Sequence, residues 1–180
     1  MRTEIQIAGF GGQGIVLAGV ILGEAAIIDG KNAVQSQSYG PESRGGAARS
    51  DVVISKEEID YPKVLNTNIL IALSQPAFDK YISEVSKKTV VVIDKDLVDS
   101  NDKSHFRVPF TKIADNLGRK VVANSVMLGY IAASTGVLKR ASLEKAIKKN
   151  IPAGTEKINM KAFEEGWSLG EIGKSTKKVK

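Results

Sequence analysis

The residues best suited to chemistry lie in two glycine-rich segments near the start of the chain. The first, Gly9-Phe10-Gly11-Gly12-Gln13-Gly14, has the GxGxxG spacing and stands between two apolar runs. Such a turn lets the backbone approach a phosphate, and a helix that follows it adds free N–H groups and a partial positive charge. The residues alone fit two interpretations: a phosphate-binding turn, or a tight strand-to-helix turn without a ligand.

The second segment reads Ser38-Tyr39-Gly40-Pro41-Glu42-Ser43-Arg44-Gly45-Gly46. Proline fixes one backbone angle, and the glycines allow another chain or a ligand to come close. Arg44 could bind a phosphate or a carboxylate through two parallel hydrogen bonds. It could equally form an ion pair within the loop, with Glu42 or near Arg49. The segment is thus either a ligand-facing loop or a loop shaped by its own charges.

Four further polar residues have specific expected roles. Gln13 is predicted either to donate a hydrogen bond to a phosphate or to cap the helix that follows it. Asn124 is predicted to cap a helix over 124–134. Asp94 follows a buried strand, and we expect a helix cap or a salt bridge there. His105, the only histidine, lies among charged and polar neighbours and is expected to be exposed.

Strands and helices are predicted to alternate along the whole chain. Valine and isoleucine occupy both faces of the strands, which indicates a sheet covered on both sides. We therefore predict an α/β fold: a doubly wound, mainly parallel sheet with helices on both faces, a Rossmann-like three-layer sandwich. The expected strands are 5–8, 33–37, 48–55, 68–73, 89–94 and 106–110, and the expected helices are 14–28, 75–86, 111–117, 124–134, 141–150 and 155–172.

The predicted sheet has a consequence for the two glycine-rich segments. The turn at 9–14 follows the first strand at its carboxyl end, where ligands gather in α/β sheets. If the strand at 33–37 is parallel to the first, its loop leaves at the same edge. We then expect 9–14 and 39–46 to form one continuous surface, with Arg44 as its cation.

A dinucleotide site fits the sequence less well. Such sites use an acidic residue at the end of the second strand for NAD, or an arginine for NADP. Here that strand ends Gln35-Ser36-Gln37-Ser38, and the first arginine after it is Arg44. A stand-alone NAD(P)-dependent oxidoreductase stays as a rival hypothesis.

Composition excludes several other classes. The 180 residues contain no cysteine, so this chain can form no disulfide and can ligate no iron–sulfur cluster through cysteine. The net charge of +6 is partly due to the four lysines of residues 174–180, which we expect to be a flexible basic tail after a single domain over 1–173. No nucleic-acid-binding motif is present. The longest apolar stretch, 15–28, contains Glu24 and is too short to span a membrane, so a cytoplasmic protein is expected.

The two glycine-rich segments together resemble the gamma subunit of the 2-oxoacid:ferredoxin oxidoreductases, the family of pyruvate, 2-oxoglutarate and branched-chain 2-oxoacid enzymes. The resemblance extends over nearly the whole chain and includes Asn124-Ser125-Val126-Met127-Leu128-Gly129. The small subunit of indolepyruvate oxidoreductase is similar and stays as an alternative.

The resemblance implies an accessory subunit without a catalytic residue of its own. The complete enzyme would oxidise a 2-oxoacid with coenzyme A (CoA) and ferredoxin, with thiamine diphosphate carrying the carbanion chemistry. Alpha, beta and ferredoxin-like delta subunits would hold thiamine and the iron–sulfur clusters, and the isolated chain could self-associate. The cofactor-facing residues implied here are Gly9, Gly11, Gly12, Gln13, Gly14, Tyr39, Glu42 and Arg44.

Overall fold

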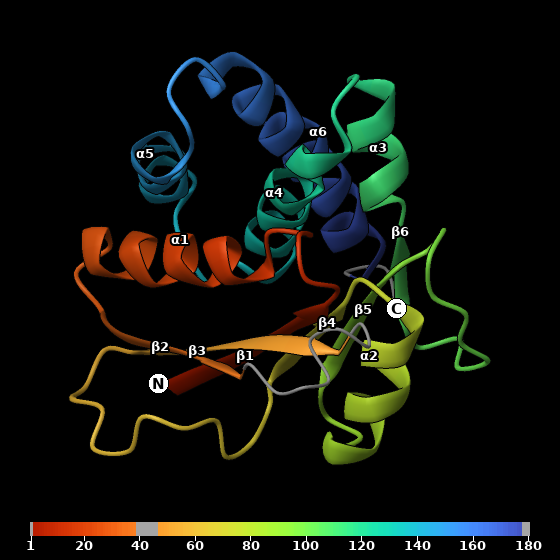
Figure 1. Ribbon diagram of the computed structural model, residues 1–180. Coiled ribbons are helices and arrows are strands. Elements are labelled where there is room, and N and C mark those ends of the chain that lie inside the picture. Colours follow the sequence, from red (N-terminus) through yellow and green to blue (C-terminus); the bar gives the residue numbers. More distant parts are fainter. Residues whose placement is uncertain (1, 39–46, 178–180) are drawn as a thin grey trace.

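The computed structural model describes residues 2–38 and 47–177, with side chains up to residue 173. Within these residues, strands form one mixed sheet in the order β2-β3-β1-β4-β5-β6 (Figure 1). Along the chain the strands are β1 (Arg2–Gly9), β2 (Asn32–Ser38), β3 (Ala48–Ser55), β4 (Ile69–Ala72), β5 (Val90–Asp94) and β6 (Phe106–Val108).

Most strands run in the same direction. The β1–β4, β4–β5 and β5–β6 pairs are parallel. Strand β3 is antiparallel to both β1 and β2, so β2 points the same way as β1. The predicted α/β fold with a mainly parallel sheet is confirmed, and β3 is the exception to the parallel order.

Helices cover the two faces of the sheet unequally (Figure 1). The large core on one face joins the sheet to α1, α3, α4, α5 and α6. A smaller core on the other face joins β4 and β5 to α2. The helices are α1 (Ile15–Ile28), α2 (Gln75–Tyr81), α3 (Phe110–Asn116), α4 (Ala123–Thr135), α5 (Arg140–Asn150) and α6 (Glu156–Lys177), with short 3₁₀ turns η2 (Ile82–Glu84) and η3 (Lys120–Val122).

The predicted helix over 75–86 is shorter than expected, because α2 ends at Tyr81 and continues as η2. At the other end of the chain, α6 extends to Lys177, into the segment expected to be a tail. The division into a domain over 1–173 and a tail over 174–180 stays a prediction. None of the helices in the described part of the chain has the length and apolar character needed to cross a membrane.

Helices α4 and α6 pack with their backbones almost in contact. Gly129 of α4 faces the backbone around Phe163, and Gly166 of α6 faces the backbone around Val126. A side chain at either glycine would collide with the other helix. Because glycine has no side chain, Gly129 and Gly166 allow α4 and α6 to approach each other closely within the large core.

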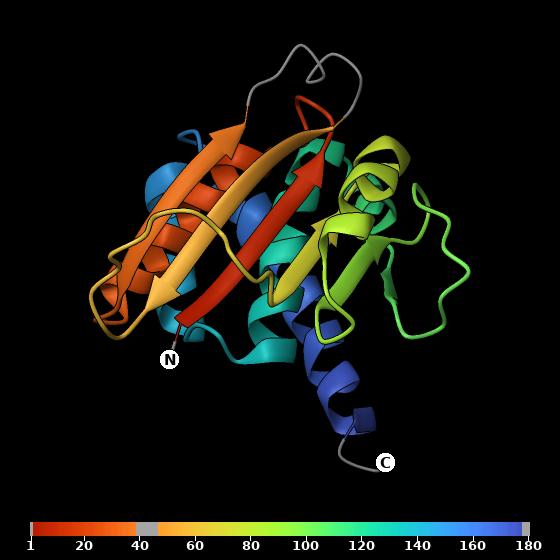
Figure 2. The ribbon, with the colours of Figure 1, turned by 90° about the horizontal axis from the view of Figure 1, so that it is seen from below.

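The segment between β3 and β4, residues 56–68, is an excursion on the side of the sheet opposite α1, where it crosses in front of the strands in Figure 2. Glu4 of β1 fixes it: its buried carboxylate accepts hydrogen bonds from the backbone N–H groups of Leu65 and Asn66, both 2.6 Å long. The Arg2 guanidinium binds the same carboxylate at 2.6 Å. One buried acid thus satisfies two backbone donors of a segment without regular secondary structure.

We expect Glu4→Ala to lower the free energy of unfolding by about 2 kcal/mol, because two backbone N–H groups and one guanidinium would lose their acceptor. Urea denaturation followed by circular dichroism measures this change. Glu58→Ala removes an exposed acid from the same excursion and should change stability by less than about 0.5 kcal/mol. Equal effects of the two substitutions would contradict the anchoring role of Glu4.

Candidate functional site

The glycine turn connects the carboxyl end of β1 to α1. Gly12 and Gly14 have φ angles of +96° and +70°, which side chains rarely allow. Gly14 occupies the N-cap position of α1, and no side chain caps this helix start within the described residues. The first N–H groups of α1 therefore open onto the turn and can meet an anion.

Gln13 braces the turn against the sheet. Its side-chain oxygen accepts a hydrogen bond from the Phe10 N–H at 2.6 Å, and its amide group donates to the Leu73 carbonyl oxygen at 2.8 Å. Gln13 does not cap α1, so that alternative of the sequence analysis is wrong. Its amide group instead holds the turn next to the end of β4. A contact between Gln13 and a phosphate stays a prediction.

Asn124 lies against the turn from α4. The predicted N-cap role is wrong, because η3 runs directly into α4 and the N-cap position falls on Val122. Asn124 sits within the first helical turn, where its oxygen accepts a hydrogen bond from the Ser125 N–H at 2.8 Å. Its amide nitrogen is 2.5 Å from where a Cβ of Gly14 would be. A glycine at position 14 is therefore favoured for two reasons: its backbone angle, and the close approach of the Asn124 side chain.

Two hollows flank the turn. One, of about 280 Å³, lies between Gly12, Leu97, Thr111 and Lys120. The Lys120 side chain is 69% exposed, and its ammonium group is 3.9 Å from the Asp115 carboxylate. Sequence analysis did not identify Lys120, because its place beside the glycine turn depends on the packing of η3.

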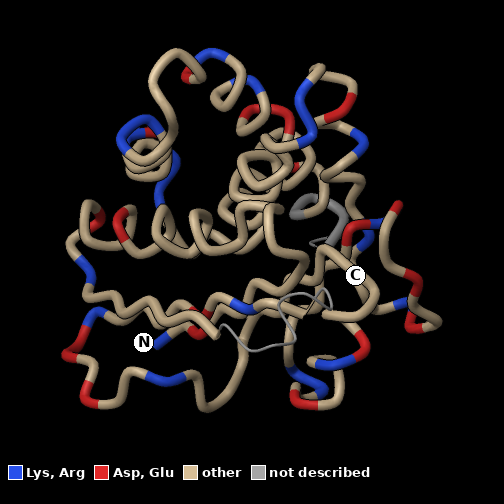
Figure 3. The backbone as a smooth tube through the Cα atoms, in the orientation of Figure 1, with Lys and Arg blue, Asp and Glu red and all other residues tan. Residues whose placement is uncertain are grey.

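The other hollow, of about 640 Å³, is mainly apolar and runs along Val16, Leu17 and Val20 of α1 to Ala48. Helix α1 carries a single charged residue, Glu24, and Figure 3 shows how little charge lies along it. No carboxylate lines either hollow within the described residues. The surface around the turn is therefore suited to a ligand with an anionic part and an apolar part.

The end of β2 and the start of β3 lie at the same edge as the glycine turn (Figure 2). Ser38 pairs with Arg49, and Ala48 pairs with Gly9. This register meets the condition set by the sequence: β2 runs parallel to β1, and the segment between β2 and β3 departs from the carboxyl edge. Tyr39, Glu42 and Arg44 themselves lie outside the described residues.

Arg49 connects the start of β3 to the segment that contains Tyr81 and Glu84. Its guanidinium lies 3.1 Å from the Asp51 carboxylate, 3.2 Å from the Glu84 carboxylate and 4.9 Å above the ring of Tyr81. The Tyr81 hydroxyl donates to the Ala47 carbonyl oxygen at 2.9 Å. Burial raises the pKa of the Asp51 carboxyl despite the neighbouring Arg49. These contacts fix the point where the chain returns to the sheet after residue 46.

The expectation for Asp94 is confirmed and that for His105 is wrong. The Asp94 carboxylate accepts hydrogen bonds from the N–H and hydroxyl of Thr111, at 2.9 and 2.7 Å, and so caps the first turn of α3. The His105 side chain is only 9% exposed. Its ring binds the Ser100 hydroxyl at 2.7 Å and packs edge-on against Phe78.

Fold and site together define a Rossmann-like α/β protein with a glycine turn at the carboxyl edge of its sheet. Residues 4–169 match the family described as pyruvate ferredoxin/flavodoxin oxidoreductase. The chain belongs to this family, as a gamma subunit of the 2-oxoacid:ferredoxin oxidoreductases. The resemblance noted in the sequence is thereby confirmed.

Several relatives match almost the full length of the chain. It is 49% identical over 178 residues to 2-oxoglutarate synthase subunit KorC of Methanocaldococcus jannaschii, covering 95% of each chain. It is 48% identical to the KorC subunit of Methanothermobacter marburgensis, covering 94% of this chain and 97% of that one. The crystal structure of the keto/oxoacid ferredoxin oxidoreductase gamma subunit from Geobacter sulfurreducens superposes with a TM-score of 0.85 at 40% identity, covering 96% of this chain and 98% of that one.

Proposed function

We propose that the chain completes the active-site wall of a thiamine-dependent, CoA-acylating 2-oxoacid:ferredoxin oxidoreductase, and that the surface around its glycine turn contributes to CoA binding. The observation that carries the proposal is the shared edge: the turn at 9–14 lies together with the end of β2 and the start of β3. The open N-terminus of α1 and Lys120 attract phosphates. The apolar hollow along α1 suits the less polar part of CoA.

We propose 2-oxoglutarate as the substrate of the complete enzyme. The two archaeal relatives that match the chain at 49% and 48% identity are both 2-oxoglutarate synthase subunits. These matches do not favour the alternatives, an indolepyruvate oxidoreductase small subunit or a stand-alone NAD(P)-dependent oxidoreductase. The assembled complex should oxidise 2-oxoglutarate faster than pyruvate or a branched-chain 2-oxoacid when a viologen dye accepts the electrons.

The cofactors of the complex belong, in this proposal, to the partner subunits. Thiamine diphosphate would be held by the alpha and beta subunits, and iron–sulfur clusters would carry electrons through the ferredoxin-like delta subunit to ferredoxin. The sequence of this chain offers no cysteine for a cluster. The purified chain should be colourless and inactive alone, and iron bound to it would contradict the proposal.

Apolar side chains on the surface support contact with partner subunits. Phe10 in the turn is 44% exposed, Ile27 of α1 is 58% exposed and Val121 is 57% exposed. We propose that these residues are covered in the complex, and that the isolated chain self-associates through them. We also propose a cytoplasmic location and no role for nucleic acid or membrane.

Arg44→Ala tests the CoA proposal in the reconstituted complex. We expect kcat/KM for CoA to fall by about 10- to 150-fold, because a charge-assisted hydrogen bond to a phosphate contributes about 1.5–3 kcal/mol. Steady-state kinetics with varied CoA measures this fall. Lys63→Ala removes one positive charge from the exposed excursion and should leave CoA dependence unchanged. An Arg44→Ala complex that assembles and keeps its CoA dependence would show that Arg44 only shapes its loop.

A further inference from the structure

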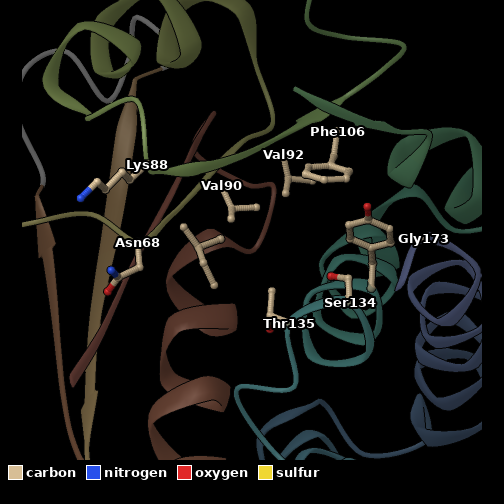
Figure 4. Close-up of a pocket in the computed structure, with 10 residues that line it drawn as sticks. Asn68, Lys88, Val90, Val92, Phe106, Ser134, Thr135 and Gly173 are labelled. Atoms are coloured by element: carbon tan, nitrogen blue, oxygen red, sulfur yellow. The ribbon is translucent and has the colours of Figure 1, made fainter. Parts of the chain in front are cut away.

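A cavity of about 340 Å³ opens at the amino edge of the sheet, opposite the glycine turn. One wall consists of the beginnings of β4, β5 and β6, and the other of the last two turns of α4 (Figure 4). Its volume falls in the range of pockets that bind small molecules. Because it lies at the other edge of the sheet, it is distinct from the surface proposed for CoA.

Tyr130 of α4 lines this cavity. The residue is 6% exposed, and its ring packs edge-on against Phe110 with the centroids 5.8 Å apart. Its hydroxyl lies near Gly173 of α6, which also lines the cavity. Within the described residues this hydroxyl has no hydrogen-bond partner. Burial raises the pKa of Tyr130, so the hydroxyl keeps its proton and can donate it in a hydrogen bond. Because Tyr130 lines the cavity, a polar atom of a ligand or a water molecule there can accept this proton.

One end of the cavity is polar and positively charged. Asn68 and Lys88 stand there, at the end away from Phe106 (Figure 4). The Asn68 side-chain oxygen accepts a hydrogen bond from the Glu4 N–H at 2.7 Å, which leaves its amide N–H groups for another acceptor. Lys88 has no ion pair in the described part of the chain, and no carboxylate lines the cavity there.

The middle of the cavity is apolar. Val90 and Val92 of β5 lie between the two polar ends, and the ring of Phe106 stands beside Val92 (Figure 4). A ligand that fits must therefore have three parts in order: an anionic group, an apolar or aromatic body and a hydrogen-bonding oxygen. Each part meets a matching protein group, which is the usual arrangement of a small-molecule site.

We propose that the amino-edge cavity binds a small amphipathic carboxylate that carries a hydroxyl at its far end. The carboxylate lies between Lys88 and Asn68, the apolar body lies along Val90, Val92 and Phe106, and the far hydroxyl hydrogen-bonds to Tyr130. The site does not depend on the proposed CoA surface, so either proposal can fail without the other.

Three probes that differ by one group each test the proposal on the full chain: para-hydroxyphenylpropionate, phenylpropionate without the hydroxyl, and para-ethylphenol without the carboxylate. Titration calorimetry should give saturable binding, tightest for para-hydroxyphenylpropionate. Tyr130→Phe should weaken para-hydroxyphenylpropionate and para-ethylphenol by about 5-fold and leave phenylpropionate unchanged, because phenylpropionate has no hydroxyl that could contact Tyr130. Lys88→Gln should weaken both acids by about 2- to 5-fold and leave para-ethylphenol unchanged.

Two further variants complete the test. Lys87→Gln removes the neighbouring lysine, which does not line this cavity, and should leave all three affinities unchanged. Ser134→Phe fills the cavity and should abolish binding. If circular dichroism shows that this variant does not fold, the other two variants still decide the question. Tyr130→Phe should affect only the two probes with a hydroxyl, and Lys88→Gln only the two with a carboxylate. Absence of saturable binding to the wild-type chain, or an equal loss for both acids in Tyr130→Phe, would overturn the proposal.

Discussion

Gly166→Ala should destabilise the protein by about 3 kcal/mol, at the upper end of what overpacking costs in a well-packed core. The added Cβ would lie 1.9 Å from the carbonyl oxygen of Val126 and 2.7 Å from its carbonyl carbon. Both atoms belong to the backbone of α4, so no rotamer change relieves the collision, and the two helices must move apart. Urea denaturation followed by circular dichroism measures the loss.

The matched control is Gly23→Ala, which makes the same chemical change within α1. A Cβ at Gly23 meets no atom within 4 Å. There the substitution should stabilise the chain by about 0.5–1 kcal/mol, because alanine loses less backbone entropy than glycine in a helix. Similar unfolding midpoints for the two variants would show that α4 and α6 do not pack as closely as described.

Gly14→Ala should also cost about 3 kcal/mol, for two separable reasons. Its φ angle of +70° is unfavourable for alanine by about 1–2 kcal/mol. The new Cβ would in addition lie 2.5 Å from the side-chain nitrogen of Asn124. The same unfolding measurement applies, and in the assembled complex this variant should bind CoA more weakly because the turn is displaced.

A double-mutant cycle separates the two reasons. Gly12 has a φ angle of +96°, and a Cβ added there would meet no atom within 4 Å. Gly12→Ala should therefore lower the free energy of unfolding only through the unfavourable backbone conformation. Combining Gly14→Ala with Asn124→Ala removes the collision, and the coupling between them should be about 1–2 kcal/mol. If the changes in the free energy of unfolding of the two single variants simply add in the double variant, the Asn124 side chain moves away without cost and does not support the turn.

The elements that sequence analysis predicted well are those with a local signal. The strand at 48–55 was predicted with the bounds that β3 has, and α1 was displaced by one residue at its start. Apolar runs and the glycines of the turn determine these elements without help from distant residues. Gly30, directly after the C-cap of α1, has a φ angle of +75°, the left-handed conformation that glycine commonly adopts after a helix.

The direction of β3 could not be predicted in this way. A buried strand reads alike whether it is parallel or antiparallel, and the choice depends on the length of the segment that precedes it. The positions of Asn124 and Lys120 and the presence of the amino-edge cavity could not be predicted either. They depend on contacts between residues far apart in the sequence, such as Asn124 with Gly14, and a local sequence pattern does not indicate such contacts.

Sequence analysis identified the glycines and Gln13 of the turn but not the contacts that hold them in place. The prediction of a common edge for the two glycine-rich segments agrees with the register of β1, β2 and β3. The bracing by Gln13 was missed because Leu73 lies sixty residues further along the chain. The roles of Tyr39, Glu42 and Arg44 stay predictions.

Because Ser38 pairs with Arg49, the sheet fixes both ends of the β2–β3 connection, and residues can be inserted between them at little cost in stability. Both ends of the connection are held in register by the sheet, and Tyr81 and Glu84 hold its far end from below. Lengthening a loop between fixed ends costs only about 0.6 kcal/mol for each doubling. An affinity tag or a fluorescent reporter placed between residues 38 and 47 should leave the fold intact while it changes what this edge of the subunit can bind.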